Sequence, residues 1–176
     1  MPALRHLVFD FTPAEKSLAE LPFATRLTGL GFFRAAAAMK LTGLEALREL
    51  EWLTVNEDHQ WLDFLAAGAF APLRTLQVLD VRYVDLARIV PHQDLEYLYV
   101  GKADRVGNVA ALAELPLLRK VHFSRCGSLD AAPPHRPGTP HRLRRLTFAH
   151  TRTTPERAGL PRHLREGAVS PGPYPR

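Results

Sequence analysis

The chain contains a single cysteine, Cys126, among its 176 residues. An internal disulfide is therefore excluded, and the fold must be stabilised by packing alone. The sequence also lacks an apolar run long enough to span a bilayer, and its first residues have neither the basic leader nor the apolar segment of a secretory signal. We expect no membrane association and, by default, a cytoplasmic location.

Motifs for catalysis or metal binding are missing as well. The sequence has no glycine-rich phosphate loop, and its eight histidines form no close pairs at the helical spacing of a metal site. Ser124 and His122 lie on one face of an expected strand, about 6.6 Å apart, which is too far for direct proton transfer. Cys126 is expected to be a small buried group and not a nucleophile. We predict a non-catalytic protein that holds no cofactor and no metal.

Proline is plentiful, and it accumulates where apolar residues become scarce. Residues 131–141 contain four prolines and no large apolar side chain, so they cannot form an amphipathic return segment and should be an irregular loop. Five further prolines punctuate residues 153–176, which we expect to be a largely disordered tail. Residues 1–152 are long enough and apolar enough for one domain.

The net charge of +5 is unevenly distributed. Residues 1–134 carry 14 lysines and arginines against 16 acids, a net charge of −2, whereas residues 135–176 carry nine arginines against two acids, a net charge of +7. An arginine-rich region of this kind can bind nucleic acid or an acidic protein surface, and it can equally be a solvated tail that keeps the protein soluble.

The most abundant feature of the sequence is a repeated leucine pattern, L-x-x-L-x-L with small variations. It occurs seven times in steps of 23, 23, 26, 19, 23 and 25 residues, and the copies open at Leu4, Leu27, Leu50, Leu76, Leu95, Leu118 and Leu143. A period of about 20 to 29 residues is typical of units that stack side by side and bury their apolar faces against their neighbours. The sequence therefore predicts a solenoid.

The fourth copy can be read in two registers. Leu73, Leu76 and Val78 fit the pattern nearly as well as Leu76, Leu79 and Val81. We take the second register, because residues 76–82 align with residues 50–56.

These apolar positions resemble the leucine-rich repeat family over residues 4–151. The resemblance implies an α/β fold, a curved solenoid with a parallel concave sheet of about seven strands and short helices or 3₁₀ turns on the convex side. Only Cys126 matches the family's asparagine or cysteine eight positions after the first leucine, so we expect irregular turns and a looser strand ladder. Helical spacing predicts short helices over residues 59–69 and 108–115, and Pro91 leaves room only for a turn or 3₁₀ segment.

Side chains that alternate with the buried leucines should point away from the core, because successive residues of a strand face opposite sides. Aromatic and charged residues cluster at these positions, and Trp52 and Tyr97, two copies apart, should lie roughly 10 Å from each other. Exposed aromatic and arginine side chains on a rigid sheet are typical of binding hot spots, although strands also favour aromatics by propensity. The candidate partner-binding residues are Phe33, Trp52, Asp80, Arg82, Tyr97, Tyr99, Lys120 and His122.

The resemblance implies a protein–protein recognition module, such as an adaptor, an inhibitor or an immunity-type protein, that binds its partner on the concave sheet. The alternative is a nucleic-acid or anion binder that uses the arginine-rich C-terminal region together with Lys120, His122 and Arg145. The sequence before the strand expected at residues 7–11 has no amphipathic capping segment, so this edge could be covered by self-association, by the partner, or by sequence of a longer parent protein.

Overall fold

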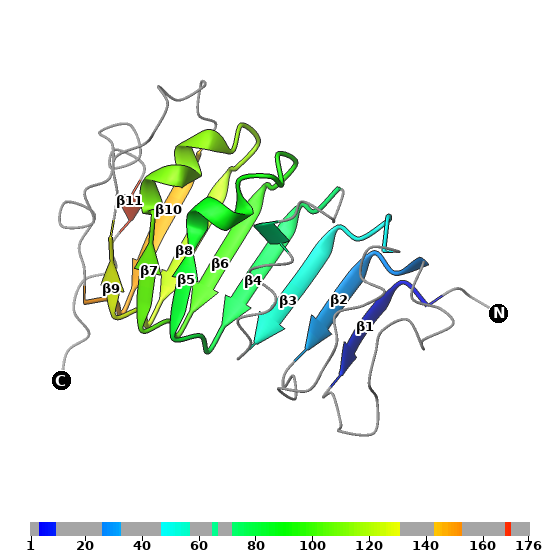
Figure 1. The fold of residues 1–176 in the computed structure, drawn as a ribbon, viewed down its shortest axis with the longest axis horizontal. Coiled ribbons are helices and arrows are strands. Elements are labelled where there is room, and N and C mark those ends of the chain that lie inside the picture. Colours follow the sequence, from blue (N-terminus) through cyan, green and yellow to red (C-terminus); the bar gives the residue numbers. More distant parts are fainter. Residues whose placement is uncertain are drawn as a thin grey trace.

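The structure is a computed structural model, and it describes residues 4–9, 26–32, 47–56, 65–66, 72–130, 143–152 and 168–169. Its main layer is an eight-stranded sheet in the order β1-β2-β3-β4-β6-β8-β10-β11, in which every pair is parallel. A three-stranded sheet, β5-β7-β9, and two 3₁₀ helices lie on the other side of the core (Figure 1). The predicted curved solenoid of parallel strands is confirmed.

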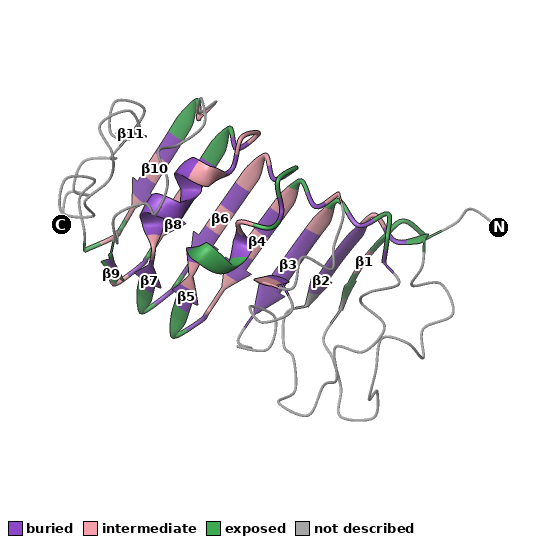
Figure 2. Ribbon diagram, turned by 45° about the horizontal axis from the view of Figure 1, so that its top comes forward, coloured by how far each residue is buried: buried purple, intermediate pink, exposed green. Residues whose placement is uncertain are grey.

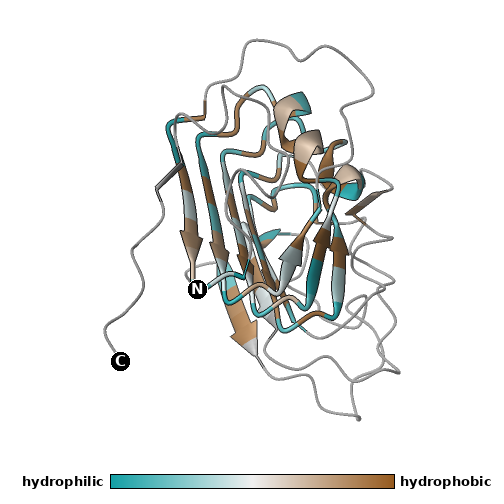
Figure 3. Ribbon diagram, turned by 90° about the vertical axis from the view of Figure 1, so that its left-hand side faces the viewer, coloured by the Kyte–Doolittle hydropathy of each residue, from teal (hydrophilic) through white to brown (hydrophobic). Residues whose placement is uncertain are grey.

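The elements follow one another in coils. The main sheet contains β1 (His6–Phe9), β2 (Gly29–Phe32), β3 (Trp52–Asn56), β4 (Thr75–Leu79), β6 (Tyr97–Gly101), β8 (Lys120–Ser124), β10 (Arg145–Ala149) and β11 (Ala168–Val169). The second layer contains β5 (Tyr83–Asp85), η4 (Leu86–Ile89), β7 (Arg105–Gly107), η5 (Val109–Glu114) and β9 (Ser128–Leu129). Parallel strands need a crossover connection, and the second layer supplies it (Figure 3).

The core forms because apolar residues alternate along each strand and stack between strands. Leu76, Leu98, Val121 and Leu146 occupy one register across β4, β6, β8 and β10, and each is at most 1% exposed. Residues of the second layer such as Val84 complete the interior. Figure 2 shows the same alternation as buried segments along the strands. The leucine pattern of the sequence is thus the interior of the solenoid.

The register taken for the fourth copy is wrong. Leu76 pairs with Leu53 and Val78 with Val55, so Leu73 opens this copy. Leu73 is buried and Leu79 is half-exposed, as this register requires. The two registers looked alike because Val81, which fills the interior at the turn, extends the apolar pattern beyond the strand. With Leu73 in place, the steps from the third to the fifth copy become 23 and 22 residues, and the short 19-residue step disappears.

The expectation of irregular turns is also wrong for the described coils. The residue seven positions after the opening leucine has the same left-handed backbone in four successive coils, with φ between 52° and 55°; these residues are Asp80, Lys102, Arg125 and His150. In three of these coils the next position is buried, and it holds Val81, Ala103 or Cys126; in the fourth it holds the half-buried Thr151. The Arg125 N–H donates to the Ala149 carbonyl at 2.8 Å, and Asp80 and Lys102 make the equivalent bonds. The same left-handed residue therefore recurs at the turn of each of these four coils.

The segments between strands agree in part with the predictions. A short helix occurs within residues 108–115, but it is the 3₁₀ helix η5, and η4 is the 3₁₀ segment expected before Pro91. In the helix predicted over residues 59–69, only Leu65 and Ala66 are described, and both are α-helical. The proline-rich loop at 131–141 lies outside the described residues. So does most of the tail, except for β11, an additional strand that the sequence did not predict.

None of the helices in the described residues is long and apolar enough to cross a membrane.

Candidate functional site

On the face of the main sheet away from the leucine core, the side chains form two columns that run across the strands, and of these residues Thr54 is buried. One column contains Trp52, Thr75, Tyr97, Lys120 and Arg145, and the other contains Thr54, Gln77, Tyr99, His122 and Thr147. Neighbours in a column lie about 4.8 Å apart, so the predicted separation of Trp52 and Tyr97 by two strands is confirmed. We call these ten residues the sheet face. It changes from aromatic at β3 and β6 to cationic at β8 and β10.

Two of the aromatic rings, Trp52 and Tyr99, lie over glycines. Trp52 Cη2 lies 3.2 Å from the position that a Cβ on Gly31 would take, and Tyr99 Cε1 lies 2.7 Å from that of Gly101. The Tyr99 and His122 ring centroids are 5.1 Å apart. A side chain at either glycine would have to displace the ring, so Gly31 and Gly101 position these aromatics. In the sequence, glycines at positions adjacent to aromatic residues are the signal that predicts this packing.

Partial burial changes the titration of two groups on the sheet face. Burial raises the pKa of the Tyr97 hydroxyl, and the neighbouring Tyr99 raises it further. Burial lowers the pKa of the His122 imidazole. Near neutral pH, Tyr97 therefore remains a hydrogen-bond donor, and His122 is mostly neutral. The positive charge of this region comes from lysine and arginine.

A hollow of about 950 Å³ lies over the starts of β4, β6, β8 and β10. Its lining contains five cationic side chains and one carboxylate; the lining residues are Arg74, Thr75, Glu96, Tyr97, Arg119, Lys120, Val121, His122, Arg144, Arg145 and Thr147. We call it the basic hollow. Arg74, Arg119 and Arg144 lie one residue before β4, β8 and β10, so the alternation of side chains within the strands does not predict them.

Glu96 compensates only part of this charge. Its carboxylate lies 3.4 Å from Arg74 Nη1 and 3.5 Å from Arg119 Nη1. Lys120, Arg144 and Arg145 make no ion pair with any residue that the structure describes. The positive charge of the basic hollow is therefore concentrated over β8 and β10.

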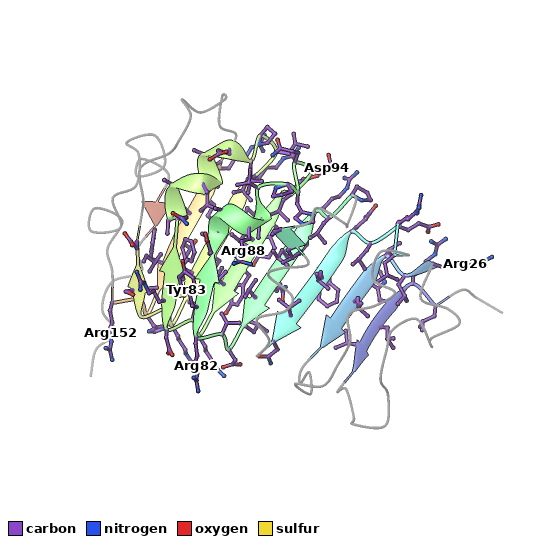
Figure 4. The ribbon with its side chains drawn as sticks, viewed as in Figure 1. Arg26, Arg82, Tyr83, Arg88, Asp94 and Arg152 are labelled. Carbon is purple, nitrogen blue, oxygen red and sulfur yellow. The ribbon has the colours of Figure 1, made fainter. Side chains whose placement is uncertain are left out.

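The structure places two of the predicted site residues away from the sheet face. Asp80 lies in the turn after β4, where its carboxylate is 3.1 Å from Lys102 Nζ. Arg82 follows in the same turn and points outward at the lower edge in Figure 4. The register error caused this misplacement, and Thr75 and Gln77 occupy the positions assigned to them. Trp52, Tyr97, Tyr99, Lys120 and His122 lie together as predicted, and Phe33 lies outside the described residues.

Cys126 is 1% exposed, and its Sγ donates to the Val100 carbonyl at 3.5 Å. Burial raises the pKa of its thiol, although backbone hydrogen bonds act in the opposite direction. A buried thiol of raised pKa is a poor nucleophile, in agreement with the prediction for this residue. In the described part of the chain, no three histidine, cysteine or acidic side chains are grouped as a metal site requires.

No protein-family model and no curated protein matches this chain. Among solved structures, an internalin from Listeria monocytogenes is similar to it, with a TM-score of 0.49 and 16% sequence identity. The alignment covers 77% of this chain and 45% of the internalin, so this chain spans less than half of that protein. A likeness at this level carries no argument about family or function. The strand pairing itself establishes the parallel-stranded solenoid.

Proposed function

We propose that this protein is a non-catalytic recognition module that binds a protein partner on the sheet face. The observation that carries the proposal is the column that runs from Trp52 through Tyr97 to Lys120 and Arg145 in unbroken register. It presents large aromatic rings and cationic groups on adjoining strands of one rigid layer. Tryptophan, tyrosine and arginine are the residues most often found at the energetic centres of protein interfaces.

The geometry supports binding in a second way, because the rings are already held in place. Trp52 rests over Gly31, and Tyr99 lies between Gly101 and His122. Side chains that are ordered before binding lose little conformational entropy when a partner covers them. We therefore assign Trp52, Tyr97 and Tyr99 as the aromatic anchors, bordered by the Lys120 ammonium group and the neutral His122 ring.

A second candidate function is the binding of nucleic acid or another polyanion, and the basic hollow favours it. Lys120, Arg144 and Arg145 could pair with phosphates, and such binding would weaken steeply as salt increases. Salt and nuclease sensitivity therefore distinguish the two functions.

The test is affinity capture from the native cell lysate at low and high salt, with nuclease treatment in parallel. Wild-type protein is compared with Trp52→Ala and Tyr99→Ala, and the matched control is Tyr83→Ala. Tyr83 is 40% exposed, but it belongs to β5 in the second layer (Figure 4). Far-UV circular dichroism and urea unfolding confirm that each variant is folded.

We expect a discrete protein that resists salt and nuclease and that is recovered by wild type and Tyr83→Ala but not by the two sheet-face variants. Equal recovery by all four proteins would remove the sheet face from consideration. Recovery of nucleic acid that is lost in salt would support the second candidate.

A further inference from the structure

Like charges are crowded together in the basic hollow. Lys120 and Arg145 are register partners on β8 and β10, and both are exposed on the same face. Beside them, the Arg144 N–H donates to the Arg119 carbonyl at 2.8 Å, so these two arginines are also neighbours. Like charges directly opposite each other destabilise a sheet. Repulsion between these cations destabilises the protein when no ligand is bound. A bound anion would convert this repulsion into attraction.

The carboxylate already present in the hollow relieves only part of this crowding. Glu96 precedes β6, and it lies within 3.5 Å of Arg119 Nη1 and 3.4 Å of Arg74 Nη1. Among the described residues, the charges without an ion pair lie one strand further along, on Lys120 of β8, and two strands further along, on Arg144 and Arg145 at β10. A ligand for this region therefore needs two or more negative groups, and it must fit beside Tyr97 and Tyr99.

We infer that the basic hollow binds an acidic segment of a protein partner, with its carboxylates over Lys120, Arg144 and Arg145 and an apolar side chain against Tyr97. This inference rests on the proposed function and specifies the chemistry of the partner at that site. Lysine and arginine recognise carboxylates through charge-assisted hydrogen bonds, which are stronger than neutral ones. The neighbouring tyrosines supply apolar contact area together with a hydroxyl donor.

Two observations favour an acidic peptide over nucleic acid. The hollow extends over four strands, about 14 Å from β4 to β10, which is enough for a short segment but small for a continuous phosphate backbone. Glu96 lies within that span and would repel phosphates that pass over it. A peptide can place its carboxylates on the β8–β10 side and an uncharged residue near Glu96.

The probe is a fluorescein-labelled peptide of four glutamates and one tryptophan, with binding measured by fluorescence anisotropy at about 50 mM and about 200 mM sodium chloride. A labelled oligothymidine of similar charge is titrated in parallel. The test variant carries Lys120→Glu and Arg145→Glu together.

The matched control carries Arg26→Glu and Arg82→Glu. It has the same change in net charge, but at exposed residues that do not line the hollow (Figure 4). A second, milder variant, Lys120→Gln with Arg145→Gln, covers the case in which the charge reversal prevents folding.

We expect the peptide affinity to fall by about tenfold or more in the test variant and by less than about twofold in the control. Absence of peptide binding to wild type would overturn the inference, as would equal losses in test and control. Tighter binding of the oligothymidine would overturn it in favour of nucleic acid.

Capture of the natural partner separates this inference from the proposed function. If Trp52→Ala abolishes capture and the Lys120 and Arg145 double variant retains it, the recognition function stands and the acidic segment is refuted. If neither variant affects capture, the sheet face itself is refuted.

Discussion

The repeated left-handed turn residue permits a sharp test of the coil geometry at Arg125. Its φ is 54°, and left-handed backbone costs a residue with a Cβ atom about 1 to 3 kcal/mol. Glycine avoids this cost, but it loses about 0.5 to 1 kcal/mol more in backbone entropy on folding. The Arg125 N–H still donates to the Ala149 carbonyl after substitution, because that bond involves only the backbone. Arg125→Gly should therefore be more stable than Arg125→Ala by about 0.5 to 2 kcal/mol.

Comparison of glycine with alanine at the same site cancels the loss of the exposed arginine side chain. Arg105 serves as the control, because it is also exposed but lies in β7 without a positive φ. There the sign reverses, and Arg105→Gly should be less stable than Arg105→Ala by about 0.5 to 1 kcal/mol.

Urea unfolding followed by far-UV circular dichroism measures the four variants. In thermal unfolding of the same variants, a difference of about 1 kcal/mol in the free energy of unfolding would change Tm by about 2 to 4 °C for a protein of this size. If Arg125→Gly were no more stable than Arg125→Ala, the left-handed turn that recurs from coil to coil would be wrong.

Three further perturbations have expected outcomes. Asp85→Ala removes the acceptor for the Ala87 N–H at 3.0 Å and for Asn108 Nδ2 at 2.7 Å. The free energy of unfolding measured in urea should therefore fall by about 1 to 2 kcal/mol, and Asp85→Asn should recover part of that loss. The Cys126 thiol should react with a disulfide reagent at least about tenfold more slowly in native protein than in urea, and equal rates would show that it is accessible. The pKa of His122 in the folded protein lies below its ordinary value of 6.5, so its stabilising contribution is complete above pH 6.5 and is lost as pH falls through the lowered pKa. His122→Gln should therefore lose less stability than wild type on acidification. If the free energies of unfolding of the two proteins fell in parallel with pH, the lowered pKa would be contradicted.

Most of the fold could be predicted because each coil repeats the same physical requirement. Buried leucines recur wherever a strand faces the interior, so the period alone defined the stacked strands and the positions of Tyr97, Tyr99, Lys120 and His122 on one face. The predicted register of the fourth copy was wrong because an apolar turn residue, Val81, produced a second leucine-like pattern that was shifted by three residues. Only the pairing of Leu76 with Leu53 decides between the two registers.

The basic hollow could not be predicted from strand alternation. Arg74, Arg119 and Arg144 each precede a strand by one residue, where the two-residue period of the strand does not yet apply. Their proximity follows from stacking coils of nearly equal length, which brings residues more than 20 positions apart in the sequence onto adjacent strands. The division of the charge between Glu96 and its neighbours depends on side-chain geometry, which the sequence does not specify.

Recognition by the sheet face is tested most directly by the dissociation constant of the purified complex, measured for Trp52→Ala, Tyr97→Ala and Tyr83→Ala against wild type. If the sheet face is the recognition surface, the first two variants should weaken binding by about tenfold or more, and Tyr83→Ala should change it by less than about twofold. If Tyr83→Ala lost binding and the other two variants retained it, recognition would lie on the second layer and not on the sheet face.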